Sequence, residues 1–105
     1  MSKSLIVQKY GGTSVGTLER IERVADRIVK IRKTGTDIVV VVSAMAGETD
    51  KLLKMARSLS KNPARREIDL LLSSGERISA ALLTIALQTR GIPALSMTGR
   101  QIGLQ

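Results

Sequence analysis

The chain has 105 residues, 17 of them basic and 9 acidic, for a net charge of +8, and it contains no cysteine and no histidine. This length fits one domain, and the missing residue types exclude disulfides, thiolate metal sites and cysteine or Ser-His catalysis. The positive charge favours anionic partners. The apolar run near the start is shorter than that of a signal peptide, and we expect no stretch to approach the ~18 apolar residues of a membrane span. These features, with the lack of cysteine, lead us to expect a cytoplasmic protein.

The first third of the chain predicts a strand, a loop and a helix. Residues 4–10 form a short apolar run that favours a strand. Residues 11–17 are rich in glycine and hydroxyl side chains, which is typical of a loop or a helix N-terminus. Residues 17–35 repeat apolar side chains at helical spacing, with Thr17 as the expected N-cap and Gly35 as the glycine after the helix.

The rest of the chain predicts two further strands and two further helices. Residues 36–44 contain five consecutive β-branched apolar residues, as in the buried strands of parallel sheets. Residues 45–62 begin as a loop and become a helix, and residues 63–91 are expected to be helical, with an interruption or bend at Gly75. Residues 92–99 are the candidate for a third strand.

The alternation of strands and helices predicts an α/β fold with a mostly parallel sheet. Three strands make a narrow sheet for this architecture, so we expect the chain to be part of a larger domain. A sheet cut in this way exposes an edge, which invites pairing with another copy of the chain.

The end of the first strand has the residues of an anion site. Gly11 and Gly12 allow close approach to backbone N–H groups, the following helix adds its positive end, and Lys9 adds a full charge. This pattern matches neither of the common glycine-rich nucleotide motifs. On these residues alone, phosphate binding and a tight turn with a solvated lysine are equally supported. Ser43, at the end of the second strand, either contacts a phosphate or bonds only to its own loop.

Three polar residues elsewhere are candidates for binding a second substrate. Thr49 either caps its helix or holds a carboxylate, and in isolation capping is the favoured interpretation. Glu76 and Arg77 lie between two long apolar runs, where a charge is usually paired or functional. Glu76 either binds an ammonium group or pairs with a neighbouring cation such as Arg77.

The basic residues of the helix at 17–35 are interleaved with acids. Helical spacing pairs Glu19 with Arg23 and Asp26 with Lys30, which indicates a solvated helix face. The chain has one aromatic residue, a tyrosine, so stacking platforms for nucleic acid are lacking. We therefore expect no nucleic-acid partner and no membrane partner.

Four segments together resemble the aspartate kinase family. They are "VQKYGGTSV" at 7–15, "VVVVSAMAGETD" at 39–50, "LLSSGERISAALL" at 71–83 and "SMTGRQIG" at 96–103, in that family's order and approximate spacing. The resemblance covers almost the whole chain and is greatest to the bacterial lysine- and threonine-sensitive type. It implies a three-layer α/β/α sandwich, of which residues 1–105 are an N-terminal portion. It also implies transfer of the γ-phosphoryl of ATP, bound with Mg²⁺, to the β-carboxylate of L-aspartate, in lysine, threonine and methionine biosynthesis.

The resemblance implies roles for individual residues. One group would hold ATP, with the lysine acting catalytically on the transferring phosphoryl group: Lys9, Tyr10, Gly11, Gly12 and Ser43. A second group would bind aspartate: Thr49, Glu76 and Arg77. No metal ligand is expected from these residues.

Length is the main departure from the family pattern, because aspartate kinases continue well past "TGRQIG". We therefore expect the 105-residue chain alone to show little turnover, and a homo-oligomer in the parent enzyme. Two alternatives are another kinase that forms an acyl phosphate, on glutamate or N-acetylglutamate, and a basic binding domain without enzymatic activity.

Overall fold

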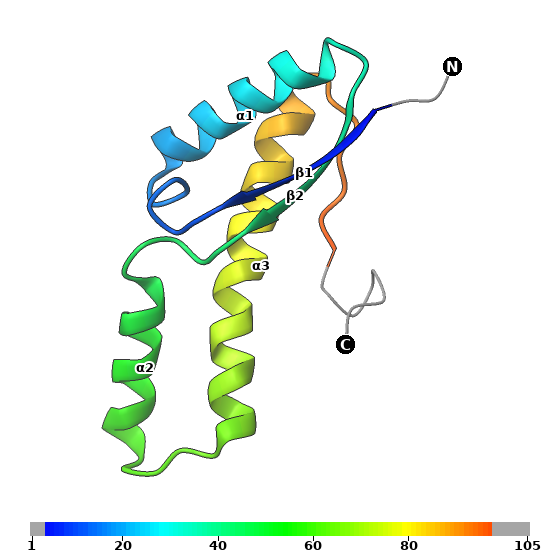
Figure 1. The fold of residues 1–105 in the computed structure, drawn as a ribbon. Coiled ribbons are helices and arrows are strands. Elements are labelled where there is room, and N and C mark those ends of the chain that lie inside the picture. Colours follow the sequence, from blue (N-terminus) through cyan, green and yellow to red (C-terminus); the bar gives the residue numbers. More distant parts are fainter. Residues whose placement is uncertain (1–3, 98–105) are drawn as a thin grey trace.

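A computed structural model describes residues 4–97, which form the elements β1–α1–β2–α2–α3 (Figure 1). The strands β1 (Leu5–Tyr10) and β2 (Asp37–Val42) pair in parallel, with Leu5 opposite Asp37 and Tyr10 opposite Val42. The helix α1 (Leu18–Arg32) connects them, as a crossover between parallel strands requires. The predicted α/β class and parallel sheet are confirmed.

Helix α1 begins after the N-cap that the sequence indicates, but it ends before the position at which Gly35 would directly follow its cap. The Oγ1 atom of Thr17 accepts a hydrogen bond of 3.1 Å from the backbone N–H of Arg20, so Thr17 is the N-cap. The helix ends at Arg32, and Gly35 follows with a φ of 84°, a left-handed conformation that suits glycine. The chain then turns into β2.

The helices α2 (Glu48–Leu59) and α3 (Arg65–Thr89) form a hairpin that extends beyond the carboxyl ends of the strands (Figure 1). Helix α3 is continuous, so the predicted interruption at Gly75 is wrong. Glycine in a helix interior costs about 1 kcal/mol relative to alanine. Glycine is nevertheless required at position 75, because α3 is buried there and packs too closely against Ala44 for a side chain.

The third strand expected at 92–99 is absent from residues 92–97, so that prediction is wrong there; residues 98 and 99 lie outside the described part of the chain. The segment still packs on the core through Ile92 and Ala94. The carbonyl of Ala94 accepts a hydrogen bond from the Gln88 side chain rather than from a strand, and Pro93 has no N–H to donate. Residues 92–97 therefore contact the core without pairing with a strand.

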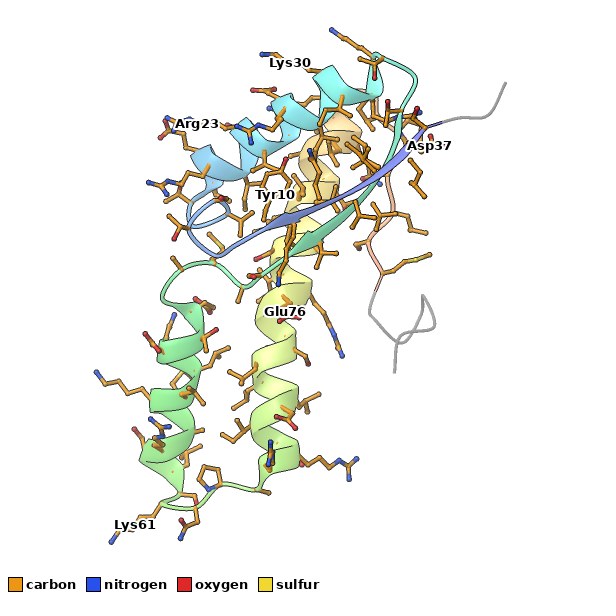
Figure 2. All side chains as sticks on the ribbon, in the orientation of Figure 1. Tyr10, Arg23, Lys30, Asp37, Lys61 and Glu76 are labelled. Atoms are coloured by element: carbon orange, nitrogen blue, oxygen red, sulfur yellow. The ribbon has the colours of Figure 1, made fainter. Side chains whose placement is uncertain are left out.

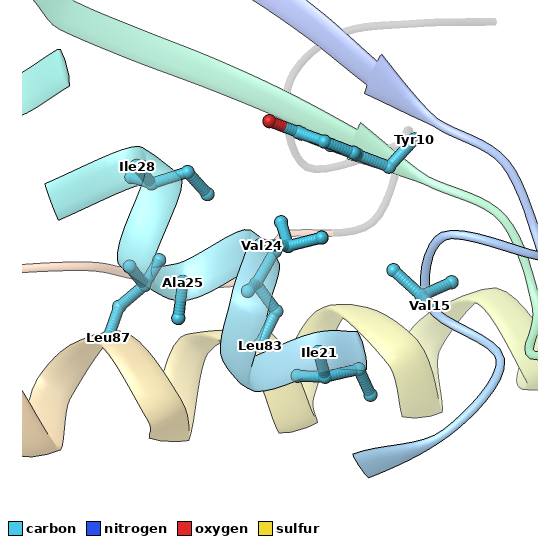
Figure 3. Close-up of a cluster of buried hydrophobic side chains, with 8 residues drawn as sticks. All are labelled: Tyr10, Val15, Ile21, Val24, Ala25, Ile28, Leu83 and Leu87. Atoms are coloured by element: carbon cyan, nitrogen blue, oxygen red, sulfur yellow. The ribbon is translucent and has the colours of Figure 1, made fainter. Parts of the chain in front are cut away.

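One hydrophobic core lies between the sheet, α1 and α3 (Figure 3). Its buried residues are Tyr10, Val15, Ile21, Val24, Ala25, Ile28, Leu83 and Leu87. Ile38, Val40 and Val42 of β2 pack against it from one face of the sheet. The opposite face exposes apolar side chains, including Leu5 at 63% and Val7 at 66%. Within residues 4–97, helices thus cover one face of the sheet.

Helix α3 has the length and apolar composition that a membrane span would need, although only 22% of its most apolar window is buried. The buried positions Gly75, Ser79, Leu83 and Leu87 recur every four residues, so they form one face of the helix. The C-terminal half of this face packs in the core shared with α1 and the sheet. Other apolar side chains of α3, including Leu70, Ile78 and Ile85, are exposed, so α3 differs from the expectation that no stretch approaches the length of a membrane span.

Candidate functional site

The carboxyl ends of β1 and β2 lie together and are joined by hydrogen bonds between the segments that follow them. The N–H of Ser43 donates to the carbonyl of Tyr10 at 3.1 Å, and the N–H of Ala46 donates to the carbonyl of Gly12 at 3.2 Å. Ligands of open α/β sheets bind beyond this edge of the strands. The structure therefore brings the glycine loop and the Ser43 loop into one place.

The glycine loop, residues 11–17, is a compact turn held at both ends. The N–H of Ser14 donates to the carbonyl of Gly11 at 3.1 Å, and the side chain of Val15 is completely buried. The Arg20 guanidinium donates to the carbonyl of Thr13 at 2.8 Å. The sequence placed Arg20 on a solvated helix face and gave no signal of this contact.

Gly11 and Gly12 differ in the space around their Cα atoms. A Cβ atom on Gly12 would lie 2.8 Å from the carbonyl oxygen of Ala44, so a side chain is excluded by backbone packing. A Cβ atom on Gly11 would have no neighbour within 4 Å. Packing therefore explains Gly12, whereas the space beside Gly11 is open to a ligand. Among the described residues, no backbone carbonyl accepts a hydrogen bond from the N–H of Gly12 or Thr13, so both groups can donate to a ligand.

Lys9 and Tyr10 lie on opposite faces of the sheet. Lys9 is exposed at the end of β1, beside Val41 in the register. Tyr10 is 7% exposed and lies in the hydrophobic core (Figure 3). Its hydroxyl donates to the side chain of Gln8 at 2.8 Å. The Tyr10 side chain therefore belongs to the core. Only the main chain of Tyr10 is available for the predicted phosphate binding.

Helix α3 reaches the two loops at Gly75. A Cβ atom there would lie 2.8 Å from the Cβ of Ala44 and 3.9 Å from the Cγ of Glu48. Glu76 follows directly, is exposed, and lies on α3 just beyond the strand ends (Figure 2). Sequence reasoning named Glu76 and counted Ala44 among the small residues at the end of the second strand, but it gave no signal that Ala44 is the buried residue against which α3 packs.

The ion pairs differ in part from those predicted. Glu19 pairs with Arg23 at 2.6 Å, as expected from their spacing. Asp26, however, pairs with Arg90 of α3 at 2.8 Å, so the predicted Asp26–Lys30 pair is wrong. Tertiary packing brings Arg90 within reach of Asp26, which sequence spacing cannot show.

Neither Glu76 nor Arg77 takes part in an ion pair within residues 4–97, and both side chains are exposed. The alternative interpretation, an internal Glu76–Arg77 pair, is therefore wrong. Both charges remain free of protein partners in this part of the chain, which is what binding a charged substrate requires.

Thr49 does not cap helix α2. The N-cap position is Gly47, with a φ of 83° and no capping side chain, and the helix begins at Glu48. The capping interpretation of Thr49 is therefore wrong, and its exposed side chain lies in the first helical turn at the same end of α2 as the Ser43 loop. Ser43 itself is half-buried.

The architecture, a parallel βαβ unit with a glycine loop against a second strand-end loop, agrees with comparisons to known proteins. The model of the amino acid kinase family matches residues 4–104, so the chain belongs to that family.

Relatives with high sequence identity are named more specifically than the family. The chain is 57% identical over 99 residues to an aspartate kinase of Stutzerimonas stutzeri and 54% identical over 99 residues to an aspartokinase of Pseudomonas aeruginosa; in both cases the match covers 94% of this chain and 24% of the relative. A crystal structure of aspartate kinase from Synechocystis matches with a TM-score of 0.87 and 56% identity, over 90% of this chain and 16% of that one. The chain thus spans about a quarter of the length of these curated relatives.

Proposed function

We propose that the protein acts as an aspartate kinase, transferring the γ-phosphoryl group of ATP to the β-carboxylate of L-aspartate to give 4-phospho-L-aspartate. Residues 1–105 would form an N-terminal portion of its amino-acid-kinase domain. The observation that carries this proposal is the meeting of the glycine loop, the Ser43 loop and the α3 segment at Glu76 around Ala44. The names of relatives at more than 50% identity support the choice of aspartate.

The glycine loop and Lys9 would hold the phosphates of ATP, which binds as its magnesium complex. Three features favour an anion at this edge: the N–H groups of Gly12 and Thr13, which bond to no residue of the described range 4–97, the open space at Gly11, and the N-terminus of α1. Phosphoryl transfer depends mainly on positioning and on neutralising charge, which an exposed lysine ammonium supplies. Ser43 would contact the same phosphates from the second strand.

Aspartate would bind between the start of α2 and the middle of α3. The carboxylate of Glu76 suits the substrate ammonium group, while Arg77 and Thr49 suit its carboxylates. The attacking β-carboxylate is already ionised at neutral pH, so no strong general base is needed. A site without histidine or cysteine is therefore compatible with this reaction.

The decisive experiment measures ADP release by the complete gene product that carries this chain, with L-aspartate, L-glutamate and N-acetyl-L-glutamate as acceptors. We expect turnover with aspartate and little with the other two. Turnover with glutamate or its N-acetyl derivative alone would replace the proposal by the alternative acyl-phosphate kinase. The isolated 105-residue chain is expected to turn over little or no aspartate.

A substitution at Glu76 tests the substrate assignment. Glu76→Gln removes a charge-assisted hydrogen bond of about 1.5–3 kcal/mol, so the KM for aspartate should rise roughly 10- to 150-fold while the KM for ATP stays near that of the wild type. The matched control is Glu67→Gln, in the exposed first turn of the same helix. An unchanged aspartate KM in Glu76→Gln would remove Glu76 from the substrate site.

The proposed function also defines the expected partners and location. We propose a cytoplasmic enzyme that binds no membrane and no nucleic acid; for nucleic acid, the support is that the basic residues of α1 alternate with acids. We also propose self-association through the exposed edge of the two-stranded sheet. Light scattering tests the last point, and a strictly monomeric chain at high concentration would contradict it.

A further inference from the structure

One small contact connects the two halves of the proposed site. Ala44 is 8% exposed and lies between two glycines. Its carbonyl oxygen is the atom that a Cβ on Gly12 would meet at 2.8 Å, and its own Cβ is the atom that a Cβ on Gly75 would meet at 2.8 Å. Real Cβ atoms essentially never approach other atoms so closely, so this three-residue contact tolerates no side chain at either glycine.

Gly75 is unfavourable for the helix that contains it. At an interior position of a 25-residue helix, alanine would be the better helix former. The φ of Gly75 is not positive, so the backbone itself does not require glycine. What excludes alanine is the closeness of α3 to Ala44, and the neighbouring residue on α3 is Glu76.

We infer that Gly75 is a positioning residue for phosphoryl transfer: by letting α3 rest directly on Ala44, it determines the distance between Glu76 and the glycine loop. This inference rests on the proposed function, in which Glu76 holds aspartate and the glycine loop holds ATP. A methyl group at Gly75 pushes α3 away from Ala44 and moves Glu76 with it. The glycine loop keeps its own contacts with the second loop, so ATP binding is spared.

The test compares Gly75→Ala, Ala44→Gly and the double variant in the complete gene product. A displacement of about 1 Å between reacting groups can cost on the order of 100-fold in rate, so we expect Gly75→Ala to lower kcat at least about tenfold and to raise the KM for aspartate. The KM for ATP should stay within about twofold of the wild-type value, because the ATP loop does not move. Ala44→Gly removes the atom that the new methyl group meets, so the double variant should recover most of the lost kcat.

Ala81→Val is the matched control, since it adds methyl groups on the exposed side of α3. It should leave both KM values and kcat near those of the wild type. Wild-type activity in Gly75→Ala, or a double variant no better than Gly75→Ala, would overturn the inference. A parallel loss of ATP affinity would also overturn it, because that is the signature of general disruption.

Urea unfolding of the same variants in the 105-residue chain separates this inference from the proposed function. If the wild-type gene product does not phosphorylate aspartate, the proposed function fails. The urea midpoints of the variants still test the contact between Gly75 and Ala44. Gly75→Ala should then lower the urea midpoint and Ala44→Gly should restore it in the double variant. If Gly75→Ala does not fold, refolding of the double variant supports the contact, and an equally unfolded double variant refutes it.

Discussion

The Gly11-Gly12 pair allows two substitutions of identical chemistry to be compared one residue apart. In Gly12→Ala the new methyl group lies 2.8 Å from the carbonyl oxygen of Ala44 and 3.5 Å from the backbone nitrogen of Ala46. These are backbone atoms of a loop that is hydrogen-bonded to Gly12 itself, so they cannot rotate away as a side chain would. Overpacking of this kind costs about 1–3 kcal/mol.

Gly11→Ala should raise the free energy of unfolding, whereas Gly12→Ala should lower it. The new methyl group meets nothing within 4 Å, and the φ of Gly11 is not positive. Replacing glycine where the backbone permits alanine stabilises a protein by about 0.4–1 kcal/mol, because the unfolded chain loses freedom. The same methyl group occupies the open space beside the loop, so it should weaken ATP binding although the fold is intact.

Urea unfolding of the 105-residue chain measures the difference. With a slope of about 1.5 kcal/mol per molar urea, the midpoint should fall by roughly 0.7–2 M in Gly12→Ala and rise by up to about 0.7 M in Gly11→Ala. In the complete gene product, Gly11→Ala should raise the KM for ATP. An unchanged or higher midpoint in Gly12→Ala would show that the two strand-end loops are not packed as described.

Three further predictions follow from burial and charge. Leu83→Ala, at a position 4% exposed, should lower the free energy of unfolding by about 3 kcal/mol, whereas Ile85→Ala, at a position 57% exposed on the same helix, should cost less than about 1 kcal/mol; urea midpoints check both. Asp26→Asn should cost at most about 1 kcal/mol, and less at high salt, because the Asp26–Arg90 pair is largely solvated on the Asp26 side, whose side chain is 63% exposed; a salt-independent loss would contradict this. Val39→Lys places a charge on β2, an edge strand of the two-stranded sheet, and should reduce self-association in light scattering; unchanged association would contradict pairing through β2.

Local patterns in the sequence were enough to predict most of the secondary structure. The strands at the start and at 36–44, the helix capped by Thr17 and the α2–α3 region all occur, because apolar periodicity and capping act over a few residues. The errors came from competing tertiary forces. Gly75 does not break α3, because its packing against Ala44 outweighs its low helix propensity. Residues 92–97 pair with no strand of the described structure, although Ile92 and Ala94 pack on the core.

In the candidate site, too, some features follow from local sequence and others only from tertiary packing. The order of strands and helices placed Lys9 and the glycines at the carboxyl edge of the sheet, whereas Glu76 was named from its apolar surroundings and from the family resemblance. The sequence by itself thus determined the α/β class and the positions of most elements, because these depend on short-range spacing, and it named the residues that we propose to bear the chemistry. Only the tertiary structure decided that Tyr10 enters the core, that Asp26 meets Arg90 and that Ala44 joins the glycine loop to α3. Each of these is a contact between segments distant in sequence, where packing and not local spacing selects the partner.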